Sequence, residues 1–266
     1  MGDVIAVVNQ KGGVGKSTTT VNLAAYLGTR GKKILCFDLD AQGNATTGFG
    51  IRKKNLTCSA YEVLAGKASV KDAILMTEFE NISLVPADAD LAGVETELVH
   101  MEQRFNRLKM QLIMIKQNYD YIFIDCPPAL GQLTINAMTA ADALLIPMLA
   151  EYYALEGLTQ LVNTKELVQA NYNPKLKIAG ILFTMYDNRL NLSRQVVEEV
   201  ERYFPEQVFQ TKIPRNVRLS EAPSYGKPIL YYDKHSKGAL AYEILGKEFL
   251  GEPLSGLDKL RMNIAK

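Results

Sequence analysis

The sequence predicts an α/β protein whose core is a doubly wound, mostly parallel β-sheet flanked by helices. Short, continuously apolar runs of four to six residues recur along the chain, as in strands that are covered on both faces. Longer amphipathic stretches separate these runs, and such strand–helix alternation is typical of doubly wound sheets. The 266 residues suffice to bury a large core, because a domain of roughly 300 residues hides about three-quarters of its chain surface.

The expected elements follow one another in a regular order. Strands are expected at residues 4–8, 33–37, 82–85, 121–124, 143–147 and 178–183. Helices are expected at residues 16–27, 95–116, 155–169, 192–203 and 239–250. No internal repeat and no linker rich in Gly, Ser or Pro divides the chain, so we expect one domain over residues 1–250. Gly251 and Pro253 end the last helix and leave a tail at residues 251–266.

Composition excludes several classes of protein. A hydrophobic fraction of 47% with 22% charged residues is incompatible with intrinsic disorder. The formal net charge is +1, so nucleic-acid binding would need a local basic patch. Three scattered cysteines are too few for a disulfide framework or a zinc site. The start of the chain lacks a secretory signal, and the longest apolar run, 143–150, is far shorter than the ~20 residues that span a bilayer. We expect a soluble cytoplasmic protein.

A glycine-rich segment lies between the first expected strand and the first expected helix. Residues 9–18 read Asn-Gln-Lys-Gly-Gly-Val-Gly-Lys-Ser-Thr. A turn of this kind exposes backbone N–H groups to phosphate oxygens, and the helix macrodipole favours the anion. In such a loop Lys16 reaches the β- and γ-phosphates, and the Ser17 hydroxyl ligates Mg²⁺. Gln10 departs from the common motif, which has glycine there. The segment predicts a nucleotide-binding loop made of Lys11, Gly12, Gly13, Val14, Gly15, Lys16, Ser17 and Thr18.

With Lys11 as a second lysine, the loop resembles the deviant Walker A motif of the ParA/MinD ATPases. The resemblance continues at residues 37–44, Phe-Asp-Leu-Asp-Ala-Gln-Gly-Asn, and at residues 124–128, Ile-Asp-Cys-Pro-Pro. It reappears at residues 213–223, Ile-Pro-Arg-Asn-Val-Arg-Leu-Ser-Glu-Ala-Pro. These segments cover the chain from residue 3 to about 250, and their combination is most similar to the chromosomal ParA proteins of the Soj branch.

The resemblance implies a slow, partner-stimulated hydrolase that converts ATP and water to ADP and phosphate, with Mg²⁺ as cofactor. ATP would drive formation of a sandwich homodimer in which Lys11 crosses to the partner's nucleotide, as an arginine finger does. Asp40 would orient the attacking water. The catalytic residues implied are therefore Lys11, Lys16 and Asp40.

Three further groups of residues take their roles from the resemblance. Ser17, Asp38 and Asp125 would form the metal site, with Asp125 holding Mg²⁺ through water, because Mg²⁺ keeps much of its hydration shell. Gly43 and Gly131 would flank two switch segments that the γ-phosphate orders. Adenine would be held by Pro214 and Asn216.

Basic residues within and before residues 207–227 raise the question of DNA binding. Residues 207–227 hold four basic residues and one acid, and in Soj-like proteins arginines at positions such as Arg189 and Arg218 bind DNA without sequence preference. Dimerisation would double this patch, and phosphate contacts carry no sequence information. The implied partners are double-stranded DNA of the nucleoid and a ParB-type centromere-binding protein. We interpret residues 52–54 as a solvated loop. The phosphate loop starts at residue 9, so we expect the small type of protein, without operator-specific DNA binding.

Two other functions fit parts of the sequence. A MinD-like membrane-surface positioning ATPase would need a basic amphipathic tail helix, and the tail offers only Leu254, Leu257, Leu260 and Ile264 with Lys259 and Arg261. It lacks Phe and Trp, so we interpret it as a packing segment or frayed end and expect no stable membrane association. An iron–sulfur reductase would need paired cluster cysteines, whereas Cys36 and Cys126 fall within expected core segments. Chromosome segregation, plasmid partition and replication control all remain open.

Overall fold

The computed structural model describes residues 2–265, without the side chains of residues 55, 259 and 262–265. Its centre is a seven-stranded sheet with the strand order β3-β4-β2-β5-β1-β6-β7. Every neighbouring pair is parallel except β3 with β4. The strands are β1 (Asp3–Val7), β2 (Ile34–Asp38), β3 (Leu75–Met76), β4 (Ile82–Val85), β5 (Tyr121–Asp125), β6 (Ala143–Leu149) and β7 (Lys177–Thr184).

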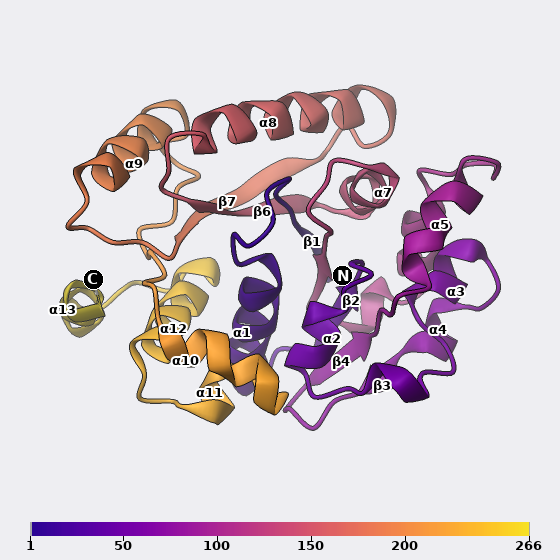
Figure 1. Cartoon of the computed structure of the whole chain (residues 1–266), viewed down its shortest axis with the longest axis horizontal. Coiled ribbons are helices and arrows are strands. Elements are labelled where there is room, and N and C mark those ends of the chain that lie inside the picture. The colour runs from indigo at the N-terminus through magenta and orange to yellow at the C-terminus, as the bar shows by residue number, and fades with distance from the viewer. Residues whose placement is uncertain (1, 266) are drawn as a thin grey trace.

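Helices cover both faces of the sheet, which confirms the predicted doubly wound fold (Figure 1). Alternate strand residues face opposite sides: Val4 and Ala6 pack into one core cluster, Ile5 and Val7 into the other. The first face carries α3 (Ala60–Ala65), α4 (Val70–Ala73), α5 (Leu91–Leu98), α6 (Arg107–Ile113), α7 (Gln132–Ala140), α8 (Ala154–Asn171) and α9 (Asn191–Tyr203). The second carries α1 (Lys16–Thr29), α2 (Asn44–Gly48), α10 (Val217–Glu221), α11 (Ile229–Tyr232) and α12 (Lys237–Phe249).

The single helix expected over residues 95–116 was wrong. The chain forms α5 and α6 there, separated by an irregular segment in which Gln103 has a φ of 51°. The buried side chain of Asn136, from α7, accepts a hydrogen bond from the Leu108 amide at 3.3 Å and donates one to the Arg104 carbonyl at 2.8 Å. A residue of another helix thus caps α6, and the local amphipathic pattern could not reveal this contact.

The tail forms a further helix, α13 (Gly256–Ala265), which packs against α12. Ser255 caps its start by accepting a hydrogen bond from the Asp258 amide at 3.1 Å, and the Asp258 carboxylate accepts hydrogen bonds from the Ser255 amide and hydroxyl. Asp258 also pairs with the Lys247 ammonium of α12 at 2.8 Å. Leu257 and Leu260 face solvent. The side chains of Lys259 and Ile264, part of the expected amphipathic pattern, lie outside the described residues. Within residues 2–265, no helix has the length and apolar character that a bilayer crossing requires.

Candidate functional site: a phosphate loop above paired carboxylates

The glycine-rich loop joins β1 to α1 at the carboxyl edge of the sheet. Gly13 and Gly15 have φ values of 71° and 85°, in the left-handed region that glycine adopts without strain. Gly15 precedes the first turn of the 14-residue helix α1, whose first N–H groups have no partner within the helix. The Thr184 hydroxyl at the end of β7 donates to the Val14 carbonyl at 2.8 Å. The loop is therefore shaped by glycine and anchored to a strand two positions away in the sheet.

Lys16 is the first residue of α1 and is almost fully buried. Its ammonium donates a hydrogen bond to the Lys11 carbonyl at 3.0 Å. Burial lowers the pKa of this ammonium from its ordinary value, while the nearby carboxylates of Asp125 and Asp40 oppose the shift. A buried cation at the start of a helix, held by a carbonyl, is arranged to bind an anion.

Two fully buried carboxylates lie side by side beneath the loop. Asp38 ends β2 and is opposite Asp125, which ends β5, in the parallel register of these strands. Burial raises the pKa of Asp125, repulsion from Asp38 raises it further, and the Ser17 hydroxyl and the Lys16 ammonium lower it. Burial also raises the pKa of Asp38, against the hydrogen bonds that its carboxylate accepts. Burial and repulsion thus oppose ionisation of both carboxyls together, and a cation bound beside them would favour their ionised forms.

Asp125 has one oxygen available for a ligand. Its Oδ1 accepts a hydrogen bond from the Thr20 hydroxyl at 3.3 Å, whereas Oδ2 is buried and has no hydrogen-bond partner among the described residues. A buried carboxylate oxygen without a donor is unfavourable. A hydrated divalent cation would satisfy it, since Mg²⁺ prefers oxygen ligands and retains waters. Ser17 and Asp125 thus fit the predicted magnesium site.

Asp38 is engaged differently from Asp125. Its carboxylate accepts hydrogen bonds from the Thr46 amide at 2.8 Å, from the Thr46 hydroxyl at 2.7 Å and from the Asp40 amide at 3.2 Å. These contacts fix the turn between β2 and α2, which begins after Gly43 in the left-handed conformation. Asp38 therefore anchors this segment, and its role in supporting Mg²⁺ hydration stays a prediction.

A cavity of about 500 Å³ opens above the phosphate loop. The predicted residues that line it are Gly12, Gly13, Gly15, Lys16, Ser17, Thr18, Asp40, Pro214 and Asn216. One Asp40 oxygen accepts a hydrogen bond from the Gln42 amide at 2.9 Å. The Asn216 side chain accepts from the Leu219 amide at 3.3 Å and so caps α10. The structure brings the loop, Asp40 and the expected adenine segment together around one cavity.

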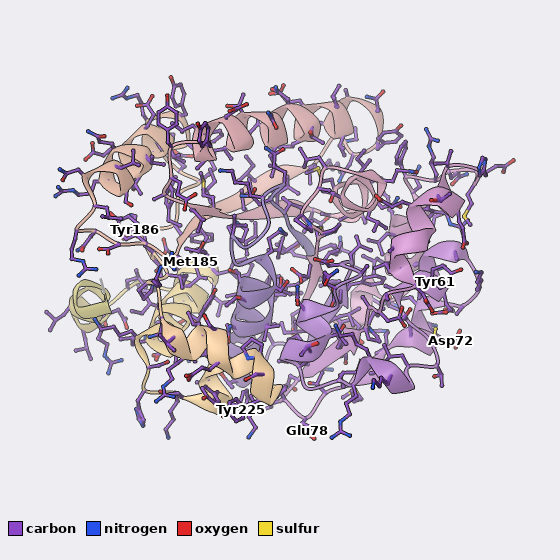
Figure 2. The ribbon with its side chains drawn as sticks, viewed as in Figure 1. Tyr61, Asp72, Glu78, Met185, Tyr186 and Tyr225 are labelled. Atoms are coloured by element: carbon purple, nitrogen blue, oxygen red, sulfur yellow. The ribbon has the colours of Figure 1, made fainter. Side chains whose placement is uncertain are left out.

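The cavity also contains residues that sequence reasoning missed. Met185 lines it with a φ of 48°, uncommon for a residue with a side chain. The Tyr186 amide beside it donates to the Ile213 carbonyl at 2.9 Å, which ties the end of β7 to the segment before Pro214. Figure 2 shows Met185 and Tyr186 where β7 leaves the sheet. The only sequence signal was their place after an expected strand, because carboxyl ends of parallel strands form the ligand edge of such folds.

Lys11 lies at the rim of this site. Its side chain does not line the cavity; instead its ammonium lies over the ring of Tyr153, 5.8 Å from the ring centroid. Its amide donates to the Asn9 side-chain oxygen at 3.0 Å. Lys11 thus has a fixed backbone and a side chain directed away from the phosphate loop's own cavity.

The two arginines expected to contact DNA are both paired with carboxylates. The exposed Arg189 guanidinium makes three hydrogen bonds to Asp187, at 2.6–3.2 Å. Arg218 contacts Glu221 at 2.9 Å and Asp233 at 3.5 Å. The hydrogen bonds from Arg189 lower the pKa of Asp187 to about 2, so this carboxylate is ionised at neutral pH. Contact of Arg189 and Arg218 with DNA stays a prediction.

Comparison with known proteins places these features in a family. A family model described as an AAA domain matches residues 2–178. The sporulation initiation inhibitor protein Soj of Bacillus subtilis is 56% identical over 248 residues, which are 93% of this chain and 98% of that protein. The chromosome partitioning protein ParA of Myxococcus xanthus is 51% identical over 250 residues, 94% of this chain and 88% of that protein.

A solved structure has the same fold as this chain. The cobyrinic acid a,c-diamide synthase of Mycobacterium smegmatis, with bound ADP and magnesium, superposes with a TM-score of 0.81 at 37% identity and covers 94% of each chain. The deviant phosphate loop, the paired strand-end carboxylates and these relatives lead to one conclusion: the chain belongs to the ParA/MinD family of P-loop ATPases, in its Soj/ParA branch.

Proposed function

We propose that this protein is an ATP-dependent dimerising switch that partitions chromosomal or plasmid DNA. The observation that carries the proposal is the buried Lys16 ammonium, which lines a cavity of about 500 Å³ and lies near the buried, unsatisfied oxygen of Asp125. This arrangement offers a cation for phosphates and an oxygen for a hydrated metal in one place. Relatives named as chromosome partitioning proteins support the biological role.

The residues of the candidate site have distinct tasks in the proposed hydrolysis. Lys16 and the first amides of α1 hold the β- and γ-phosphates. Ser17 and Asp125 hold Mg²⁺, which neutralises charge on the phosphate oxygens when bound. Asp40 orients the attacking water toward the γ-phosphorus, and Lys11 reaches the phosphates of a second copy. Pro214 and Asn216 face the adenine, with Met185 on the same wall of the cavity.

Dimerisation links the nucleotide to DNA. A chain with a net charge of +1 offers few phosphate contacts, whereas a two-fold dimer presents two copies of Arg189 and Arg218 to one duplex. The second contact is then effectively intramolecular, so affinity rises without any base readout. We propose that the ATP dimer binds nucleoid DNA in the cytoplasm, and that a ParB-type partner stimulates slow hydrolysis and so releases it.

No observation favours the membrane-surface alternative over this role. The tail helix α13 is tied to α12 by the Lys247–Asp258 ion pair at 2.8 Å. An amphipathic helix that binds lipid carries a broad apolar face with aromatic residues, and α13 contains neither Phe nor Trp. We therefore propose a function without stable membrane association.

Asp40→Ala tests the proposal. The phosphate cradle stays intact while the water loses its orienting carboxylate, so ATP binding persists, hydrolysis stops and the dimer accumulates. Size-exclusion chromatography with ATP should show a stable dimer, and gel shifts should show DNA binding by this dimer and not by the ADP-bound monomer. The exposed carboxylate variant Asp90→Ala, outside the cavity, serves as the control and should behave as wild type. A monomeric Asp40→Ala protein with normal turnover would refute the assignment.

A further inference from the structure

The backbone of Lys11 is held by hydrogen bonds on both sides, whereas its side chain is a long, flexible stem. The Lys11 amide donates to Asn9 at 3.0 Å, and its carbonyl accepts from the Lys16 ammonium at 3.0 Å. Lys16 itself lines the cavity. A flexible lysine whose carbonyl touches this residue has a bound nucleotide within reach of its four-carbon stem. If the Lys11 ammonium is to reach the nucleotide of a second copy, a contact must keep it out of the cavity of its own chain.

Tyr153 is placed to do this. Its ring centroid lies 5.8 Å from the Lys11 ammonium, within the range of a cation–π contact. Tyr153 directly precedes α8, whose first turn approaches the phosphate loop so closely that a Cβ added at Gly157 would lie 3.2 Å from the Gln10 side-chain nitrogen. The Gly157 amide in turn donates to the Tyr153 carbonyl at 3.2 Å. The ring is thus carried by a helix start that packs on the same loop.

The Tyr153 ring is not needed for the core. Its residue is 66% exposed, and the neighbouring Tyr152 is 72% exposed. The two rings meet edge to face, with centroids 5.3 Å apart. A tyrosine this exposed contributes little to folding, so its removal leaves the fold intact. The contact with Lys11 is the feature that distinguishes Tyr153 from Tyr152.

We propose that Tyr153 is a positioning residue that holds the Lys11 ammonium outside its own nucleotide cavity, ready for the nucleotide of a second copy. This rests on the proposed function, in which Lys11 acts across the dimer. Without the ring, the Lys11 side chain turns toward the phosphates bound to its own chain, because an ammonium is attracted more strongly by phosphate than by solvent. Binding of Lys11 to the phosphates of its own chain then competes with its binding to the phosphates of the second copy.

The first experiment measures ATP affinity of the monomer with a fluorescent ATP analogue, at protein concentrations too low for dimerisation. An exposed cation–π contact changes an equilibrium by about two- to five-fold. Tyr153→Ala should therefore tighten ATP binding about two- to five-fold, whereas Tyr153→Phe, which keeps the ring, should match wild type. Tyr203→Ala is the matched control, because Tyr203 is 68% exposed and lies on α9, outside the Tyr152–Tyr153 pair, and it should also match wild type.

The same measurement in a Lys11→Ala background identifies the cause. If Tyr153 acts through Lys11, then Tyr153→Ala has no effect once Lys11 is Ala. An equal effect in both backgrounds, or a Tyr153→Phe protein that behaves like Tyr153→Ala, would overturn the proposal.

Sedimentation with ATP provides the second readout, where Tyr153→Ala should weaken dimerisation about two- to five-fold and Tyr153→Phe should not. A wild-type protein that binds ATP but never dimerises would refute the proposed function, while the monomer measurement would still decide whether Tyr153 holds Lys11. Unchanged dimerisation of Tyr153→Ala beside a dimerising wild type would refute the positioning role alone.

Discussion

At the carboxyl edge of the sheet, buried charges are bonded to neutral groups: Asp38 to Thr46, Asp125 to Thr20, and Lys16 to the Lys11 carbonyl. On the outer loops, exposed charges are bonded to each other, as Arg189 is to Asp187. Neutral hydrogen-bond partners hold a buried charge in position without cancelling it, so its field remains available to a ligand. Opposite charges on the surface cancel, but such pairs contribute only about 0–1 kcal/mol and are easily exchanged for a phosphate.

Removing the buried cation should have the largest effect on ATP binding. Lys16→Ala deletes the ammonium that faces the phosphates, and hydrogen bonds to charged groups are worth about 1.5–3 kcal/mol. We expect ATP affinity, measured by isothermal titration calorimetry, to fall by about ten-fold to more than a hundred-fold. Lys54→Ala, an exposed lysine outside the cavity, is the control. Micromolar affinity retained in Lys16→Ala would contradict the phosphate-loop assignment.

Removing one neutral donor should affect stability more than nucleotide binding. Thr46→Val keeps the shape of the side chain but deletes the hydroxyl that donates to Asp38 at 2.7 Å and accepts from the Ala87 amide at 3.0 Å. The free energy of unfolding should fall by about 1–3 kcal/mol, because buried partners are left unsatisfied.

Urea unfolding measures this change. Thr47→Val is the matched control, since its hydroxyl bonds only to the Gly43 carbonyl of the preceding turn, and its effect should be smaller. Equal losses in the two variants would show that Asp38 does not depend on a neutral donor.

The sequence predicted most of the fold because the strands are short apolar runs between amphipathic segments. The second strand was expected at 33–37 and is Ile34–Asp38, and β6 was expected at 143–147 and extends to Leu149. The two-residue strand β3 was missed, because an edge pair of this length leaves no apolar run. The break between α5 and α6 was missed because its cap comes from Asn136, far away in the sequence.

The site was predictable to the extent that it is local in sequence. The phosphate loop, Asp40 and Pro214 carry their chemistry in short segments, and the structure brings them to one cavity. Met185 and Tyr153 reach the site through contacts between segments that are distant in the sequence. Their residue types are common on ordinary surfaces, so no pattern in the chain marks them.

The exposed Arg189–Asp187 ion pair can be tested by DNA binding. Asp187→Asn removes the charge that neutralises Arg189, and a surface pair is worth at most about 1 kcal/mol. The ATP-bound protein should therefore bind DNA of any sequence up to about five-fold more tightly, measured by fluorescence anisotropy. Arg189→Ala should weaken binding equally for all sequences and reduce the slope of log K against log salt. An Asp187→Asn protein that binds as wild type, beside an unaffected Arg189→Ala, would remove Arg189 from the DNA contact.

The ion pair between α12 and α13 combines features of the two regions. It joins opposite charges, as on the outer loops, but these charges are largely buried, as at the sheet edge. The Lys247 and Asp258 side chains are 21% and 6% exposed and meet at 2.8 Å. Lys247→Met keeps an apolar stem but leaves the buried Asp258 carboxylate without its cation, so amide hydrogen exchange in α13 should become more than about five-fold faster. Glu243→Gln is the control, because Glu243 contacts Lys247 from the same helix at 3.3 Å and therefore does not join the two helices through this contact.

Acid should remove this difference between wild type and Lys247→Met. Hydrogen bonds from Lys247 and Ser255 lower the pKa of Asp258 from 3.8 to about 2. A carboxyl with a lowered pKa stabilises the folded state fully above its unfolded pKa, and this contribution is lost as the pH falls through the folded value. The ratio of exchange rates in the two proteins cancels the intrinsic pH dependence of exchange. It should be constant from pH 7 to about 4 and approach one near pH 2, and a ratio that stays constant to pH 2 would mean that α13 is held by packing rather than by this pair.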